Sequence, residues 1–274
     1  TAKFRFDEFK KYHSIRNHKE DITFISSLKA CAKKKDACGL SRLHVHIVKR
    51  GLLQKSPYLA STLISVYSRC GMLAKAQHVF EEIPSRDTIS WNALIAGYSQ
   101  QGQSHEAFNC FEHMQSEGLS PDAITLTCVL KACGTIGAFD KGKQIHYQIV
   151  LRGFQKNNLV LGNALVDFYA KCGALLEAHH VIEELPIRNV ECWSTLIAGY
   201  VQAERAREAL LCFEEMQSEG HEPDAITLVC MLKVCGSVRA REEGIQIHED
   251  IRNAGLLETD VVLGNTLVDM YAKC

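Results

Sequence analysis

The chain repeats itself at a fixed offset of 102 residues. An ungapped overlay of residues 88–172 on residues 190–274 leaves 46 identities in 85 positions. The segment WNALIAGY, which begins at Trp91, returns as WSTLIAGY from Trp193. Repetition at a fixed spacing is typical of stacked units that bury their apolar faces only against their neighbours. Such a stack has no single central pocket, so we expect function to be spread along a surface.

The 102-residue period divides into three pairs of helical segments. Phe108, Phe111 and Met114 recur at helical spacing, and Gly118 is a plausible helix stop before Pro121. Similar paired segments give unit lengths of 35, 36 and 31 residues, which sum to 102. No sustained period-two alternation indicates strands. We therefore predict an all-α fold, a right-handed α-solenoid superhelix of helix-turn-helix repeats with alternating lengths of 36, 31 and 35 residues.

Composition fits this prediction. Apolar residues make up 46% of the 274, enough for a continuous core, and no apolar run approaches the roughly 18 residues of a membrane span. Small residues such as Gly97 and Gly199 fall where two helices must approach closely. We expect no membrane partner.

The chain starts at Thr1 and stops at Cys274, whereas the matching segment at Cys172 continues. This favours a piece of a longer protein, with no targeting segment visible.

Cysteine and histidine follow the same offset. Ten of the 12 cysteines recur in this way, and no Cys-x-x-Cys spacing occurs. We interpret them as small buried hydrophobes in a reducing compartment. Histidines such as His44, His146 and His248 also recur once per period, which indicates a structural place in each unit. The sequence predicts no metal site, no cofactor and no small-molecule substrate.

Several longer sequence motifs accompany these unit lengths. Besides WNALIAGY at 91–98, the chain carries FEHMQSEG at 111–118, LKACG at 130–134 and GNALVDFYAKCG at 162–173. These motifs and lengths resemble the pentatricopeptide repeat family, specifically its plant PLS subclass, in which three repeat types of unequal length alternate. The implied phasing leaves residues 1–20 as a leader outside the array 21–274. Long repeats span 21–56, 123–158 and 225–260, short repeats span 57–87, 159–189 and the truncated 261–274, and standard repeats span 88–122 and 190–224.

The resemblance implies that each repeat meets one base of a single-stranded RNA. In that family the fifth and last residues of a repeat select the base together. An Asn amide offers both a donor and an acceptor to a base edge, while Ser leaves room for a purine. The implied base-reading residues are Ser61 with Asp87 and Ser194 with Asp224 for guanine, Asn92 with Asp122 for uracil, Asn163 with Asn189 for a pyrimidine, favouring cytosine, and Asn265 for a pyrimidine.

Long repeats carry weak pairs, as is usual for that type. These pairs are Ile25 with Ser56, Thr127 with Asn158, and Val229 with Asp260. From the N-terminus the implied RNA register is x-G-U-x-C/U-G-x-Y, read 5′ to 3′. An aliphatic second residue sandwiches the bases in that family, here Ile89, Val160 and Val262. The sequence departs from this rule at Tyr58 and Glu191.

Simpler interpretations stand beside these assignments. Asn92 and Asn163 could be helix N-caps or first-turn residues, and Asp122 and Asp224 could be solvated turn residues. Trp91 and its copy at 193 could stack on bases, although their helical phase favours core packing.

The function implied by the resemblance is specificity in organellar RNA processing, most simply C-to-U editing in mitochondria or chloroplasts. Editing cofactors or a deaminase would be partners. No proline is followed by Cys, so the deaminase motif is absent from this sequence and we predict no enzyme. A net charge of −1 lacks the basic footprint of many nucleic-acid binders. The alternative is a protein-binding scaffold of the tetratricopeptide type, whose groove would be charged or apolar.

Overall fold

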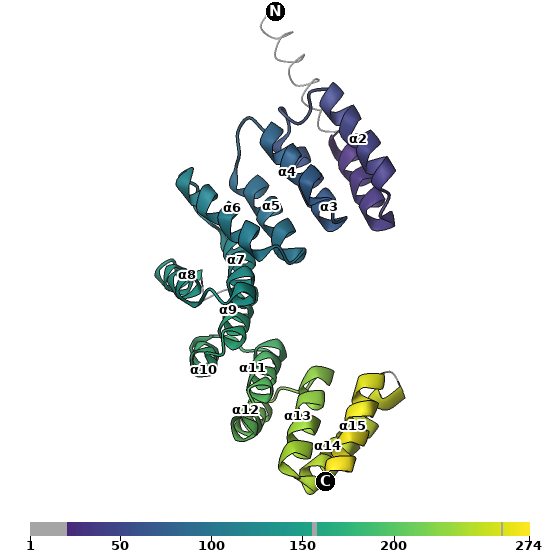
Figure 1. The fold of residues 1–274 in the computed structure, drawn as a ribbon, viewed down its shortest axis with the longest axis vertical. Coiled ribbons are helices and arrows are strands. Elements are labelled where there is room, and N and C mark those ends of the chain that lie inside the picture. Colours follow the sequence, from purple (N-terminus) through teal and green to yellow (C-terminus); the bar gives the residue numbers. More distant parts are fainter. Residues whose placement is uncertain (1–20, 155–157, 259) are drawn as a thin grey trace, which may run out of the picture. The chain divides into compact units, whose positions relative to one another are not determined.

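A computed structural model describes residues 21–154, 158–258 and 260–274. This part of the chain is helical and contains no strand, which confirms the predicted fold class (Figure 1). The predicted leader, residues 1–20, lies outside the described residues. Residues 21–34 form a helix ahead of α2. The remaining helices are α2 Ala37–Lys49, α3 Pro57–Arg69, α4 Leu73–Glu82, α5 Thr88–Gln100, α6 Ser104–Ser116, α7 Ala123–Ile136, α8 Phe139–Leu151, α9 Leu159–Lys171, α10 Leu175–Glu184, α11 Val190–Gln202, α12 Ala206–Ser218, α13 Ala225–Val238, α14 Arg241–Asn253, η2 Leu256–Glu258 and α15 Val261–Lys273.

Each repeat of the sequence phasing pairs a first helix with a second helix, save the last, which holds one. The first helices α3, α5, α7, α9, α11, α13 and α15 begin at residues 57, 88, 123, 159, 190, 225 and 261. These are the first residues of the repeats that the phasing assigns. The classification of the repeats as long, short and standard stays a prediction.

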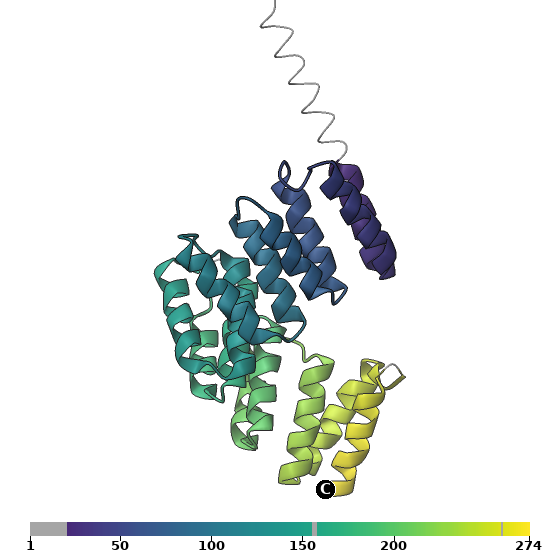
Figure 2. The ribbon, with the colours of Figure 1, turned by 45° about the horizontal axis from the view of Figure 1, so that its top comes forward.

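The described chain divides into two compact segments, with the division between residues 132 and 133, inside α7. In the N-terminal segment, α3 packs against both α4 and α5, and α5 packs against α6 (Figure 2). In the C-terminal segment, α9 packs against α11, α11 against α13, and α13 against α15. Within each segment, therefore, first helices of successive repeats lie side by side, and the core lies between them and the second helices.

Glycines mark the places where this packing is tightest. Gly118, the predicted stop of α6, has a left-handed φ of 79° just beyond the helix. Gly97 of α5 faces Ser68 so closely that a Cβ on it would lie 2.6 Å from the Ser68 Cβ. Gly199 of α11 faces Ala170 in the same way, with a corresponding distance of 3.3 Å. Both were predicted as points of close helix approach, and that prediction is confirmed.

The two tryptophans belong to the core. Trp91 and Trp193 are 4% and 2% exposed. The indole Nε1 of Trp91 donates to Glu117 at 3.1 Å, and that of Trp193 donates to Glu219 at 3.3 Å. Core packing is therefore confirmed, and the alternative of stacking platforms for bases is wrong, because neither ring offers a free face.

A histidine–tyrosine hydrogen bond recurs three times at the 102-residue offset. It joins His44 to Tyr67, His146 to Tyr169 and His248 to Tyr271, at 3.0, 2.8 and 3.0 Å. Each bond connects the second helix of one repeat to the first helix of the next. The recurring histidines therefore have structural places, as their spacing predicted.

We predict that Gly142→Ala destabilises the C-terminal segment by about 1–3 kcal/mol, whereas Gly244→Ala costs clearly less. A Cβ on Gly142 would lie 2.0 Å from the rigid Phe168 ring, but one on Gly244 would meet the thioether of Met270, which can move. Urea unfolding followed by circular dichroism measures the two costs. Equal costs would contradict the packing argument.

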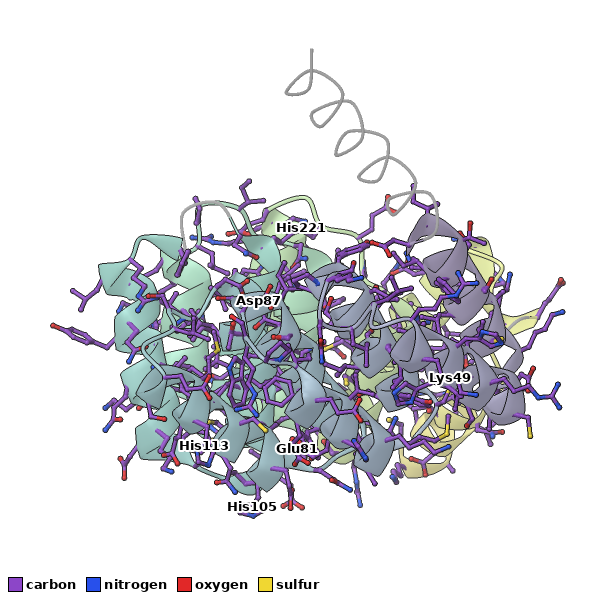
Figure 3. All side chains as sticks on the ribbon, turned by 90° about the horizontal axis from the view of Figure 1, so that it is seen from above. Lys49, Glu81, Asp87, His105, His113 and His221 are labelled. Carbon is purple, nitrogen blue, oxygen red and sulfur yellow. The ribbon has the colours of Figure 1, made fainter. Side chains whose placement is uncertain are left out.

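We also predict that the unfolding free energy decreases as the pH falls below about 6.5. Burial lowers the pKa of His146, an effect that Glu184 opposes and His180 reinforces. The unfolded chain then binds more protons than the folded chain, so stability is complete above the unfolded pKa and is lost as pH falls through the folded one. His146→Gln should flatten this dependence. The matched control is His105→Gln, because His105 projects outward from α6 (Figure 3); an unchanged slope in His146→Gln would refute the prediction.

Candidate functional site

Three positions in each repeat recur on the first helices and their junctions. We call them the second position, the reader position (the fifth residue) and the cap position (the last residue). Base recognition is predicted for the reader and cap positions. The structure shows what holds each of them in place.

Every cap residue within the described chain caps the first helix of the following repeat. Its side-chain oxygen accepts a backbone N–H from the first turn, at 2.8 Å for Asp87, 2.9 Å for Asp122 and 2.8 Å for Asp224. Ser56, Asn158, Asn189 and Asp260 do the same. The side chains are therefore tied to the junctions between repeats.

Two of the simpler interpretations are therefore wrong. Asp122 and Asp224 are half-buried N-caps rather than solvated turn residues. Asn92 and Asn163 are not N-caps, because each is the fifth residue of its helix, α5 or α9. The capping role that sequence reasoning placed on Asn92 and Asn163 falls to the residue just before the first turn of each helix.

Within each of the two segments, the second positions form an exposed, mostly aliphatic row. In seven of the eight repeats the side chain at this position is between 52% and 63% exposed. The members are Ile22, Tyr58, Ile89 and Ile124 in the N-terminal segment and Val160, Ile226 and Val262 in the C-terminal segment. Glu191 occupies the remaining second position and is also exposed. Because these apolar side chains recur at the same solvent-facing position in successive repeats, they are candidates for contact with a partner.

The Asn92 reader is held by a network with its cap residue. The Asn92 Nδ2 donates to the Asp122 carboxylate at 2.8 Å, while its Oδ1 accepts from the Thr125 hydroxyl. Asp122 in turn accepts from the Thr125 backbone N–H. The structure thus brings the predicted pair of Asn92 and Asp122 together, with Asn92 8% exposed.

The Ser194 and Asp224 pair lines an open cavity of about 360 Å³ in the C-terminal segment. The two residues are linked through Thr227, whose hydroxyl lies 3.0 Å from the Ser194 hydroxyl and 2.8 Å from the Asp224 carboxylate. The cavity wall also contains Glu191 and Ile226, the second-position residues of this repeat and the next. A flat group entering the cavity would meet two second-position side chains and, at its edge, a hydroxyl and a carboxylate.

The other reader residues are less closely tied to their caps. Asn163 bonds to Glu191 and Cys192 rather than to Asn189. Ser61 donates to the backbone carbonyl of Tyr58. Thr127 donates to a backbone carbonyl within its own helix, and Asn265 is exposed.

Sequence reasoning missed the residue at the third position of the following repeat. Thr125, Cys192 and Thr227 occupy it, and each contacts the reader residue of the preceding repeat. The signal was present, because Thr125 and Thr227 recur at the offset. Three aliphatic second-position residues, Ile22, Ile124 and Ile226, were also missed although they too recur at the offset.

One side-chain cluster with metal-ligand chemistry lies on the second helices. His179, Cys212 and Glu215 place their ligand atoms within 4.8 Å of one another, although the sequence predicted no metal site. His179 and Glu215 form an ion pair at 3.0 Å, and burial raises the pKa of the Cys212 thiol to about 12. His179 and Glu215 therefore contact each other, and the buried Cys212 thiol lies beside them.

No helix in the described ranges combines the length and apolar character that crossing a bilayer requires.

All 12 cysteines are free thiols, and burial raises the pKa of Cys133 and Cys235 to about 11. Cysteine packing as a small hydrophobe is thereby supported for these buried positions.

Comparison with known proteins identifies repeats of one kind. A family model described as the PPR repeat family matches residues 86–135 and 188–237, and a second, described as a PPR repeat, matches residues 59–87. A mitochondrial pentatricopeptide repeat-containing protein of Arabidopsis thaliana is 38% identical over 85% of this chain and 22% of its own length. A chloroplastic one is 33% identical over 93% of this chain and 41% of its own length. The chain thus spans less than half the length of these relatives.

Solved structures share the fold. A pentatricopeptide repeat protein from maize matches 91% of this chain and 37% of its own, with a TM-score of 0.66 at 21% identity. A tetratricopeptide repeat protein from Parabacteroides merdae matches 92% of this chain and 99% of its own, with a TM-score of 0.56 at 16% identity. The architecture is therefore common to both kinds of helical repeat.

The capping geometry predicts how the cap residue responds to mutation. Asp224→Ala should lower the unfolding free energy by about 1 kcal/mol, because α13 loses its N-cap, whereas Asp224→Asn should cost only a few tenths. Thermal or urea unfolding of the two variants measures this difference. Equal stabilities for both variants would show that the cap is not energetically significant.

Proposed function

Because the chain belongs to the pentatricopeptide repeat family, we propose that it binds single-stranded RNA along the first helices, one base per repeat. The observation that carries this proposal is the combination of two sets of side chains. Exposed, mostly aliphatic side chains at the second positions accompany polar reader and cap residues on the same first helices and their junctions. Stacking between apolar side chains is favourable for any base, whereas edge contacts distinguish bases.

The cavity at Ser194 and Asp224 supports a guanine assignment for the repeat 190–224. The small Ser194 side chain leaves space for a purine, and the Asp224 carboxylate can accept from the N–H groups of guanine. In the repeat 88–122, the amide of Asn92 fixed by Asp122 is the assigned uracil reader. Together with the remaining pairs, these give the register x-G-U-x-C/U-G-x-Y.

Charge indicates that base contacts supply most of the affinity. The net charge of −1 gives little general attraction to phosphates. Lys171 is a cation in the cavity wall, and it already pairs with Asp167 at 2.8 Å. We therefore infer modest affinity with a shallow dependence on salt.

The relatives carry mitochondrial and chloroplastic names, which supports an organellar location. Within an organelle, a sequence-specific RNA binder of this kind would act as a specificity factor for RNA processing, and we propose C-to-U editing, with a deaminase or editing cofactors as partners. The alternative, a tetratricopeptide-type protein scaffold, has the same architecture. Uncharged readers beside an aliphatic row fit base edges and faces better than they fit peptide side chains.

We predict that an RNA oligonucleotide of the proposed register binds more tightly than one in which the G-U step opposite the repeats 57–87 and 88–122 is changed to A-A. Each mismatched base should cost roughly 1–3 kcal/mol, so the double change should reduce affinity at least tenfold. Fluorescence anisotropy with labelled RNA at fixed salt measures both affinities. Equal affinities for the two RNAs would contradict the proposal that the chain distinguishes bases.

A single substitution tests one repeat. Ser194→Asn should move the preference at the matching base from guanine toward a pyrimidine, because an amide fills the space that a purine needs. Both side chains are uncharged, so the net charge of the protein stays the same and a general change in RNA affinity is not expected. The matched control is Ser218→Asn on the exposed end of α12, which should leave all preferences unchanged. If Ser194→Asn keeps guanine preference, the assignment of the reader position is wrong.

A further inference from the structure

The short repeat 159–189 holds its reader residue in an unexpected way. The Asn163 Nδ2 donates to the Glu191 carboxylate, and the Asn163 Oδ1 accepts from the Cys192 thiol at 2.7 Å. Asn189, the assigned partner, uses its Oδ1 to cap the Cys192 backbone N–H at 2.9 Å. The group that fixes Asn163 is thus a carboxylate from the second position of the following repeat.

This arrangement reproduces the one at Asn92. There the Nδ2 donates to the carboxylate of Asp122, and the Oδ1 accepts from the hydroxyl of Thr125. Thr125 and Cys192 occupy the same third position in their repeats. In both repeats, therefore, the amide has a carboxylate at its nitrogen end and a side-chain donor at its oxygen end.

These partners determine which way the amide faces. A carboxylate only accepts hydrogen bonds, so a reversed amide would place its oxygen against another acceptor. Burial raises the pKa of the Cys192 thiol to about 11, which keeps it protonated and able to donate at neutral pH. Each amide therefore presents its donor and acceptor in one fixed order. At N3 and C4, uracil presents a donor and an acceptor where cytosine presents an acceptor and a donor, so an amide in one fixed orientation can tell them apart.

We propose that Glu191 is a specificity-determining residue of the repeat 159–189, and that Asn163 with Glu191 selects uracil over cytosine as Asn92 with Asp122 does. This inference rests on the proposed function. It replaces the cytosine preference that the Asn163 and Asn189 pair alone would imply. It also accounts for an acidic residue in an otherwise apolar row, because the carboxylate supplies the acceptor that Asn189 does not.

The test uses the complete 274-residue chain and two RNAs of the proposed register, with uracil or cytosine opposite the repeat 159–189. The wild-type protein should prefer the uracil RNA by about tenfold, the size expected from one correctly paired base edge. Glu191→Gln should reduce this preference to less than about threefold, because a Gln amide can either accept from Asn163 or donate to it. Glu191→Val removes the acceptor altogether and should abolish the preference while completing the apolar row.

The control is the uracil-to-cytosine change opposite the repeat 88–122, whose discrimination should be the same in wild type and in both variants. Unfolding curves check that the variants fold, which we expect because Glu191 is exposed. Wild-type preference for cytosine, or a uracil preference that survives both substitutions, would overturn the role of Glu191 and leave the proposed function standing. Failure to distinguish any RNA of the register would overturn both.

Discussion

The structure depends on one hydrogen bond that is made at each repeat junction. The last side chain of a repeat accepts a backbone N–H from the first turn of the next helix, as Asp87, Asp122 and Asp224 show. An N-cap satisfies a backbone donor that a helix cannot satisfy itself, so the position is constrained by folding alone. Asp, Asn and Ser all meet that need. The fold therefore fixes where this side chain lies and leaves open which of these residues it is.

Because Asp, Asn and Ser can all cap the helix, the residue type at the cap position can differ between repeats without a change in the fold. A cap residue that can be Asp in one repeat and Asn in the next changes the partner of the reader residue beside it without disturbing the helix. In the proposed function, base selection and helix capping are two uses of the same side chain. Stability and specificity can be separated experimentally, because the Asp-to-Asn exchange preserves the first and alters the second.

The positions of the helices, of their junctions and of several exposed aliphatic side chains could be predicted from the sequence, because all three follow from its periodicity. Sequence reasoning also placed Trp91 in the core from its helical phase. It could not find the partner of Asn163, since Glu191 lies 28 residues away and belongs to the next repeat. The same limit applied to the His179, Cys212 and Glu215 cluster, which is assembled from two helices. Contacts between side chains of different repeats depend on the length and direction of those side chains, which the periodicity of the sequence does not show.

The acidic groups on the first helices and their junctions hold the side chains at the reader positions. Carboxylates at Asp122 and Asp224 repel phosphates, and Glu191 adds a third negative group. They lower general affinity for any nucleic acid, but they fix the neighbouring amides and hydroxyls in defined orientations. A protein that gains little binding free energy from the RNA backbone must obtain it from contacts with the correct base edges. A wrong base therefore removes a large share of the total binding free energy. An array of this kind suits a protein that selects one site among many similar transcripts.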